Sequence, residues 1–140
     1  GAVCVVPLLD DGSVLLERQF RYPVGKVLVE IPAGKLDSKD EDPRKAAARE
    51  LLEETGAVAG ELLELGMFLP ACAYSDEAIH MYAAKSLTFR EQKLDADEFL
   101  NVFTMPLEQA VQKVLSGEIW DAKTQTALLK VWLLRQQGRL

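Results

Sequence analysis

The sequence predicts an α/β sandwich in which a mixed β-sheet lies between helices, and three observations support this fold class. Two apolar runs, at residues 2–9 and 13–20, have the composition of strands and flank Asp10-Asp11-Gly12, a hairpin signal. Residues 43–55 carry the start and stop signals of a helix. Further strand-like segments then lead to helical patterns near the C-terminal end, so the order of elements is mixed.

The remaining elements follow along the chain. We expect a strand over residues 27–31, and then a loop at Pro32-Ala33-Gly34 that leads toward the first helix. Three later segments also have strand character: residues 62–69, 79–88 and 99–104. A helix is predicted from Pro106 to about Ser116, and Asp121 is the predicted cap of a last helix. Four apolar residues recur at core spacing in that helix: Leu128, Leu129, Trp132 and Leu133.

The first helix has clear boundaries. Asp42 can cap its free amides, Pro43 suits the first helical position, and Gly56 is a natural left-handed terminator. At 100° per residue, one face is small or aliphatic and is expected to pack inward: Ala47, Ala48, Leu51, Leu52 and Thr55. The opposite face, with Arg49 beside it, is expected to point outward: Glu50, Glu53 and Glu54.

This carboxylate cluster predicts a metal site. Glu50 and Glu54 are like charges at i,i+4, which costs an isolated helix roughly 0.2–0.5 kcal/mol, and neither has a basic residue at i±4. Oxygen ligands at i, i+3 and i+4 suit Mg²⁺ or Mn²⁺, which bind carboxylates and substrate phosphates together. The alternative interpretation is a solvated acidic face.

The same residues resemble the sequence box of the Nudix hydrolases, G-x5-E-x7-R-E-U-x-E-E-x-G-U, where U is a bulky aliphatic residue. Eight positions fill it in order: Gly34, Glu41, Arg49, Glu50, Leu51, Glu53, Glu54 and Gly56. The chain departs from it by one extra residue between Gly34 and Glu41, and by Ala57 at the last aliphatic position. The resemblance implies a Nudix-type α/β/α sandwich with a mixed β-sheet between helices.

Segments outside the box resemble the ADP-ribose and nucleotide-sugar pyrophosphatase branch of that family. They are Gln19–Pro23, Glu30–Asp37, Ser75-Asp76-Glu77, Gly117-Glu118-Ile119 and Asp121–Thr124. The resemblance implies Mg²⁺-dependent hydrolysis of the pyrophosphate bond in a nucleoside diphosphate linked to a sugar, with Mn²⁺ as the alternative metal. ADP-ribose, cleaved to AMP and ribose 5-phosphate, is the first substrate expected.

Other functions stay open. Cys72 and Ala73 stand where ADP-ribose-specific relatives tend to carry a Pro-Gly pair, so a nucleoside-diphosphate sugar such as GDP-mannose is the alternative substrate. Two alternatives belong to other classes: a non-catalytic nucleotide-binding regulatory module, and an enzyme acting on nucleic acid or nucleotides. The intact Glu50, Glu53 and Glu54 disfavour the first, and the acidic balance of the chain disfavours the second.

The resemblance also implies roles for single residues. Glu50, Glu53 and Glu54, with the Ala33 carbonyl, would bind metal. Glu53, Glu54 and Glu98 are the expected catalytic residues, with Glu98 as general base. Asp97 and Glu53 are the alternative bases, and a solvated acidic turn is the alternative interpretation of the loop that holds Glu98.

Other roles in the box are structural. Arg49 is expected to pair with Glu53 or Glu41, Gly34 to let the loop approach the helix and metal, and Gly56 to end the helix. Four residues are candidates for substrate contact: Arg18, Arg21, Glu30 and Glu77. The alternative for Arg18 and Arg21 is an exposed charge at the end of a strand.

Composition limits the class of protein. With 140 residues we expect one domain over 1–140, and the net charge of −6 without a basic stripe argues against nucleic acid as a partner. No apolar run reaches the roughly 18 residues that would span a membrane. Cys4 and Cys72 form no CxxC motif, which indicates a reducing, cytoplasmic location. Relatives in this branch carry an N-terminal segment that helps them dimerise. Because Gly1 lies directly before a strand, we expect that segment to be missing. We also expect the protein to form a homodimer.

Overall fold

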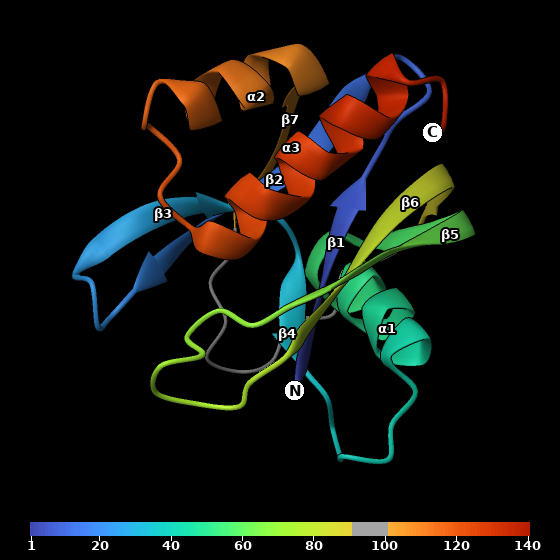
Figure 1. The fold of residues 1–140 in the computed structure, drawn as a ribbon. Coiled ribbons are helices and arrows are strands. Elements are labelled where there is room, and N and C mark those ends of the chain that lie inside the picture. Colours follow the sequence, from blue (N-terminus) through green and yellow to red (C-terminus); the bar gives the residue numbers. More distant parts are fainter. Residues whose placement is uncertain (91–100) are drawn as a thin grey trace.

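The computed structural model describes residues 1–90 and 101–140. Its strands are β1 (Ala2–Pro7), β2 (Ser13–Arg21), β3 (Lys26–Glu30), β4 (Ala33–Lys35), β5 (Ala57–Phe68), β6 (Ile79–Phe89) and β7 (Asn101–Pro106). Its helices are α1 (Pro43–Thr55), α2 (Leu107–Leu115) and α3 (Ala122–Gln136). Figure 1 shows the termini and the order of these elements.

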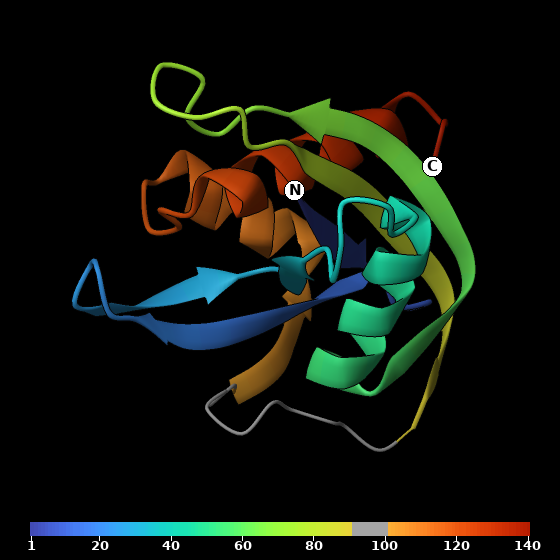
Figure 2. The ribbon, with the colours of Figure 1, turned by 90° about the horizontal axis from the view of Figure 1, so that it is seen from below.

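The strands form two sheets. The first has four strands in the order β4-β1-β6-β5, with β1 and β6 parallel and the other neighbours antiparallel. The second has three antiparallel strands in the order β3-β2-β7. Figure 2 shows the β2–β3 hairpin extending away from the four-stranded sheet.

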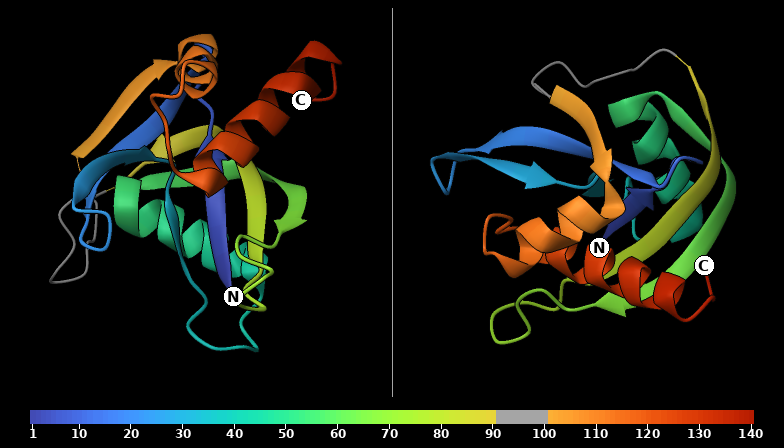
Figure 3. Two further views of the ribbon diagram at one scale, coloured as in Figure 1. Left: turned by 60° about the vertical axis from the view of Figure 1, so that its left-hand side comes forward. Right: turned by 90° about the horizontal axis from the view of Figure 1, so that it is seen from above.

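Helices cover both faces of the four-stranded sheet, and Figure 3 shows α1 and α3 on opposite sides of it. Every residue of β1 is buried, because its side chains alternate between two cores. Val3 and Val5 pack in the core that includes Leu51 of α1. Cys4 and Val6 pack in the core formed with α2 and α3. The α/β sandwich with a mixed sheet between helices is therefore confirmed.

Three details differ from the sequence-based expectations. The turn at residues 10–12 does not make a hairpin of β1 and β2, because the two strands enter different sheets and only an isolated bridge joins Leu8 to Val14. Since β1 is buried on both faces and paired on both edges, by β4 and β6, it has no edge left for β2. The expected loop around Gly34 contains the short strand β4, and β5 begins at Ala57, directly after the first helix.

The helices of the described residues, 1–90 and 101–140, include none that is long and apolar enough to cross a membrane.

Candidate active site

Helix α1 begins and ends where the sequence predicts. The Asp42 side chain accepts a hydrogen bond from the Arg44 amide (2.9 Å), and Pro43 is the first helical residue. Gly56 has a φ of 76°, and its amide donates to the Leu52 carbonyl at 2.8 Å. The carboxylates of this helix are therefore held on a firmly bounded element.

The direction of two carboxylates is opposite to the expectation. Glu50 and Glu54 are only 8% and 4% exposed and point inward, whereas Ala48 is exposed. The reason is that the inner face of α1 meets β4 as well as the apolar sheet. The Ala33 amide donates to the Glu54 carboxylate at 3.1 Å, and the missing side chain of Gly34 leaves the space that Glu50 occupies.

Arg49 joins the helix to the loop before it. Its guanidinium lies 2.7 Å from Glu50, 3.0 Å from Glu41 and 3.5 Å from Glu53. Glu41 also accepts from the Asp37 amide at 2.7 Å, and these two contacts, the Arg49 hydrogen bond first, hold the pKa of Glu41 below its usual value. The predicted pairing of Arg49 with Glu41 and Glu53 is therefore confirmed, and Arg49 also pairs with Glu50.

A second buried carboxylate, which the sequence analysis did not single out, lies against Glu54. Glu17 of β2 is 1% exposed, and its Oε2 atom has no hydrogen-bond partner among the described residues. Burial, and then the charge of Glu17, raise the pKa of Glu54; burial likewise raises the pKa of Glu17. The only sequence signal for Glu17 was a charged residue directly after the apolar run Val14-Leu15-Leu16.

This pair fits a divalent cation. Two buried carboxylates with an unpaired oxygen provide the hard oxygen donors that Mg²⁺ and Mn²⁺ prefer. In residues 1–90 and 101–140, no three acidic, histidine or cysteine side chains already converge in a metal-binding cluster. The fit therefore rests on the Glu17–Glu54 pair, with Glu50 and Glu53 one turn or less away along α1.

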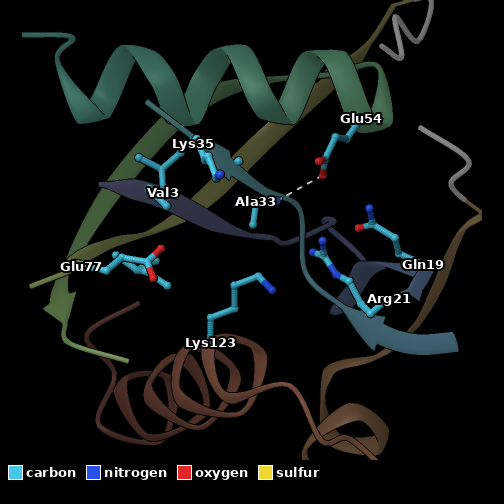
Figure 4. A pocket seen from close by; sticks show the side chains of 11 residues that line it. Val3, Gln19, Arg21, Ala33, Lys35, Glu54, Glu77 and Lys123 are labelled. Atoms are coloured by element: carbon cyan, nitrogen blue, oxygen red, sulfur yellow. Dashed lines mark hydrogen bonds between the residues drawn. The ribbon is translucent and has the colours of Figure 1, made fainter. Parts of the chain in front are cut away.

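Glu54 opens into a cavity of about 320 Å³. Figure 4 shows that side chains from four elements reach it: Arg21 from β2, Lys35 from β4, Glu54 from α1 and Lys123 from α3. Glu77 lies at another part of the wall. Positive groups and a buried carboxylate thus line the same cavity, which suits a metal-bound, multiply charged anion.

Behind two of these cations lies Glu30, which is fully buried. Its carboxylate accepts two parallel hydrogen bonds from Nε and Nη2 of Arg21, each at 2.7 Å, and a third from the Lys123 ammonium at 2.6 Å. Burial alone would raise the pKa of Glu30, but Arg21 and Lys123 outweigh it and hold that pKa below its usual value. Glu30 is therefore not among the residues that line the cavity, although the two cations that it holds are.

Comparison with protein families finds a match to the NUDIX domain over residues 1–128. The chain belongs to the NUDIX domain family. The resemblance recognised from the box and its flanking segments is confirmed by this match.

Individual Nudix relatives support the same branch. The chain is 43% identical to an ADP-ribose pyrophosphatase of Bacillus subtilis over 91% of its length and 70% of the relative. It is 31% identical to a GDP-mannose pyrophosphatase of Pectobacterium atrosepticum, over 96% of its length and 76% of the relative. A crystal structure of an ADP compounds hydrolase superposes with a TM-score of 0.86 at 28% identity, covering 99% of this chain and 75% of that one.

The structure does not bring all the predicted Nudix site residues together. Arg21, Ala33, Glu54 and Glu77 line the cavity. Arg18 does not, because alternate residues of β2 point to opposite faces, and its guanidinium lies 3.7 Å from the centre of the Phe103 ring. The predicted base Glu98 and its alternative Asp97 lie outside the described residues.

Proposed function

We propose that this Nudix chain is a divalent-metal-dependent pyrophosphohydrolase that cleaves the P–O–P linkage of a nucleoside diphosphate attached to a sugar. ADP-ribose, giving AMP and ribose 5-phosphate, is the first substrate. The observation that carries the proposal is the cavity wall on which Glu54, backed by Glu17, lies with Arg21, Lys35 and Lys123. A diphosphate is the common ligand that needs both metal-binding carboxylates and cationic side chains.

The proposed metal ligands are Glu50, Glu53, Glu54 and the carbonyl of Ala33, with Glu17 beside them. A bound Mg²⁺ or Mn²⁺ would polarise a phosphoryl oxygen and lower the pKa of a water molecule. Arg21 would hold a phosphate oxygen through the N–H groups that Glu30 does not use. Glu77 would accept hydrogen bonds from the sugar or base.

The general base is a proposal with three candidates. Glu98 is the first, and Asp97 and Glu53 are the alternatives. Glu53 is half-buried and contacts Arg49 at 3.5 Å, so its carboxylate is held at the edge of the acidic cluster. Glu98→Gln is expected to lower kcat with little change in metal affinity; an unchanged kcat would move the role to Asp97 or Glu53.

GDP-mannose is the second candidate substrate. It is favoured by the relatives named GDP-mannose pyrophosphatase and by the absence of a Pro-Gly pair at Cys72-Ala73. The chemistry would be the same, since only the base and sugar differ. The exposed ring of Tyr74 follows directly in the same loop and would be free to stack on either base.

The proposed setting is a cytoplasmic homodimer. Exposed apolar side chains on the β2–β3 hairpin and beside it, at Phe20, Tyr22, Val27 and Trp120, support a second copy as the partner. Light scattering coupled to size-exclusion chromatography tests this: a monomer at micromolar concentration would contradict it.

The activity is tested with a panel of ADP-ribose, ADP-glucose, GDP-mannose, UDP-glucose and a dinucleoside polyphosphate, each with Mg²⁺ and with EDTA. We expect Mg²⁺-dependent release of AMP and ribose 5-phosphate from ADP-ribose. Cleavage of GDP-mannose alone would keep the reaction and change the substrate. Cleavage of none of them would contradict the proposed function.

A further inference from the structure

The cavity is lined by one buried cationic side chain to which the Nudix resemblance gave no role. Lys123 is the second residue of α3, and its side chain is only 12% exposed, yet it lines the cavity together with Arg21. In Figure 4 both side chains point into the same space, although they come from different elements, β2 and α3. The hydrogen bond from Lys123 to Glu30 joins residues 93 positions apart in the chain.

Lys123 is held in place from two directions. Its ammonium donates to Glu30 at 2.6 Å and to Asp121 at 3.0 Å. An ammonium has three N–H groups, so one is left for a ligand in the cavity. Burial alone would lower the pKa of Lys123, but Asp121 and Glu30 outweigh it and raise that pKa, which keeps the group charged at neutral pH.

The two carboxylates that hold Lys123 are fixed by the fold. Asp121 caps α3 by accepting from the Thr124 amide at 3.0 Å, and it also accepts from the Thr124 hydroxyl. The Thr124 hydroxyl oxygen accepts in turn from the Ile31 amide at 3.0 Å, which ties the start of α3 to the end of β3. Glu30 lies in that same stretch of backbone, so the positions of Glu30 and Lys123 are set together.

The arrangement separates the charges by depth. The two cations line the cavity, whereas neither Glu30 nor Asp121 does. Arg21 uses only its Nε and one Nη atom on Glu30, which leaves further N–H groups free. An anion in the cavity would therefore meet two oriented donors whose counter-charges lie behind them.

We propose that Lys123 is a substrate-contacting residue that binds the diphosphate together with Arg21, and that Glu30 is the positioning residue that orients both cations. This inference rests on the proposed function for the identity of the ligand. In this proposal Glu30, a candidate for substrate contact in the sequence, is instead the shared acceptor behind the phosphate site. It also gives the Asp121–Thr124 cap a role in shaping that site.

The first test compares Lys123→Met with Lys123→Arg. For Lys123→Met we expect KM for ADP-ribose to rise about tenfold with kcat changed less than about threefold, because a charge-assisted hydrogen bond to the ground-state diphosphate is lost. Lys123→Arg keeps the charge and is expected to restore KM to within about threefold. A KM within about twofold of wild type for folded Lys123→Met would overturn the proposal.

A matched control and a second variant keep this test decisive. Lys113→Met removes the exposed ion pair with Glu118 on α2, away from the cavity, and is expected to leave KM unchanged. If circular dichroism shows that Lys123→Met does not fold, Lys123→Gln takes its place with the same expected KM, since a neutral amide can still donate to Glu30 and Asp121.

The role of Glu30 is tested by a double-mutant cycle. Glu30→Gln is expected to raise KM in the same direction, because Arg21 and Lys123 lose their shared charged acceptor. The KM increase in the double variant Glu30→Gln/Lys123→Met is expected to be much smaller than the product of the two single-variant increases, since both residues act on one site. Full multiplicativity in folded proteins would overturn the positioning role.

Calorimetric binding of ADP-ribose in EDTA separates this inference from the proposed function. If the wild type cleaves ADP-ribose and Lys123→Met binds ADP-ribose as tightly as the wild type does, only the inference is overturned. If the wild type binds ADP-ribose but cleaves no member of the panel, and Lys123→Met binds ADP-ribose about tenfold more weakly, only the proposed function is overturned. If GDP-mannose is the substrate cleaved, it replaces ADP-ribose as the probe.

Discussion

A Cβ atom placed on Gly34 would lie 2.1 Å from the carboxyl carbon of Glu50. Real Cβ atoms do not approach other heavy atoms so closely, so Gly34 and Glu50 occupy one space between β4 and α1. The Glu50 carboxylate cannot simply rotate away, because it is buried and held by Arg49 at 2.7 Å. The glycine of the Nudix box is thus required here by packing rather than by backbone conformation.

The first prediction concerns Gly34→Ala. The new methyl group displaces the Glu50 carboxylate, so we expect metal-dependent hydrolysis to fall at least about tenfold. We also expect the free energy of unfolding to fall by about 1–3 kcal/mol, because Glu50 loses its buried ion pair. Initial rates at saturating Mg²⁺ and urea denaturation measure the two effects.

Gly117→Ala is the matched control for that change. No atom lies within 4 Å of a Cβ at Gly117, but its φ of 82° is unfavourable for alanine. This substitution is expected to cost about 1 kcal/mol of stability and leave the rate unchanged. Equal rates in Gly34→Ala and Gly117→Ala would contradict the packing argument.

The second prediction concerns Glu54→Gln. Removing a proposed metal ligand is expected to lower turnover about a hundredfold or more. In EDTA, however, the variant is expected to be as stable as wild type or more stable. Burial and Glu17 raise the pKa of Glu54, so folding without metal requires this carboxyl to take up a proton, a cost that the neutral glutamine amide avoids.

Metal-dependent stability provides the check on Glu54. Wild type is expected to gain about 2.7 kcal/mol at an Mg²⁺ concentration a hundred times the dissociation constant, and Glu54→Gln much less. Thermal unfolding with Mg²⁺ and with EDTA measures this difference. Glu108→Gln, an exposed change on α2, serves as control, and an equal Mg²⁺ response in all three proteins would argue against Glu54 as a ligand.

A third prediction follows from the pairing of Glu41 with Arg49. The pKa of Glu41 is lower in the folded protein than in the unfolded chain, so its contribution to stability is present above the unfolded pKa. That contribution is lost as pH falls below about 4.3 and through the folded pKa. Glu41→Gln should therefore show a shallower loss of stability below that pH, measured by urea unfolding at a series of pH values. Parallel curves for the two proteins would contradict it.

Local signals predicted much of the fold, and long-range contacts account for what they missed. Asp42, Pro43 and Gly56 act on their own neighbours, so the bounds of α1 could be predicted from sequence. Glu50 and Glu54 point inward because β4 packs against α1, and the periodicity of the α1 sequence gives no information on where β4 lies.

The same reasoning applies to the cations of the cavity. Arg21 belongs to a segment with a family resemblance, and it lines the cavity. Lys123 lies in the segment Asp121–Thr124, which resembles the branch, but the sequence did not indicate a role for it, because its contact with Glu30 spans 93 residues. Arg18 was, like Arg21, a candidate for substrate contact, but the alternation of β2 turns it to the other face, against Phe103.

The last prediction distinguishes the two thiols. Cys4 is fully buried in β1, and burial raises its pKa to about 12, so little thiolate forms at pH 8. Cys72 is exposed in the loop between β5 and β6. We expect iodoacetamide at pH 8 to modify Cys72 quickly in the native protein, and Cys4 only after denaturation. Cys72→Ser should then abolish native-state labelling, measured by intact mass. Labelling of Cys4 at a comparable rate would mean that β1 opens between α1 and α3, contrary to its place in both cores.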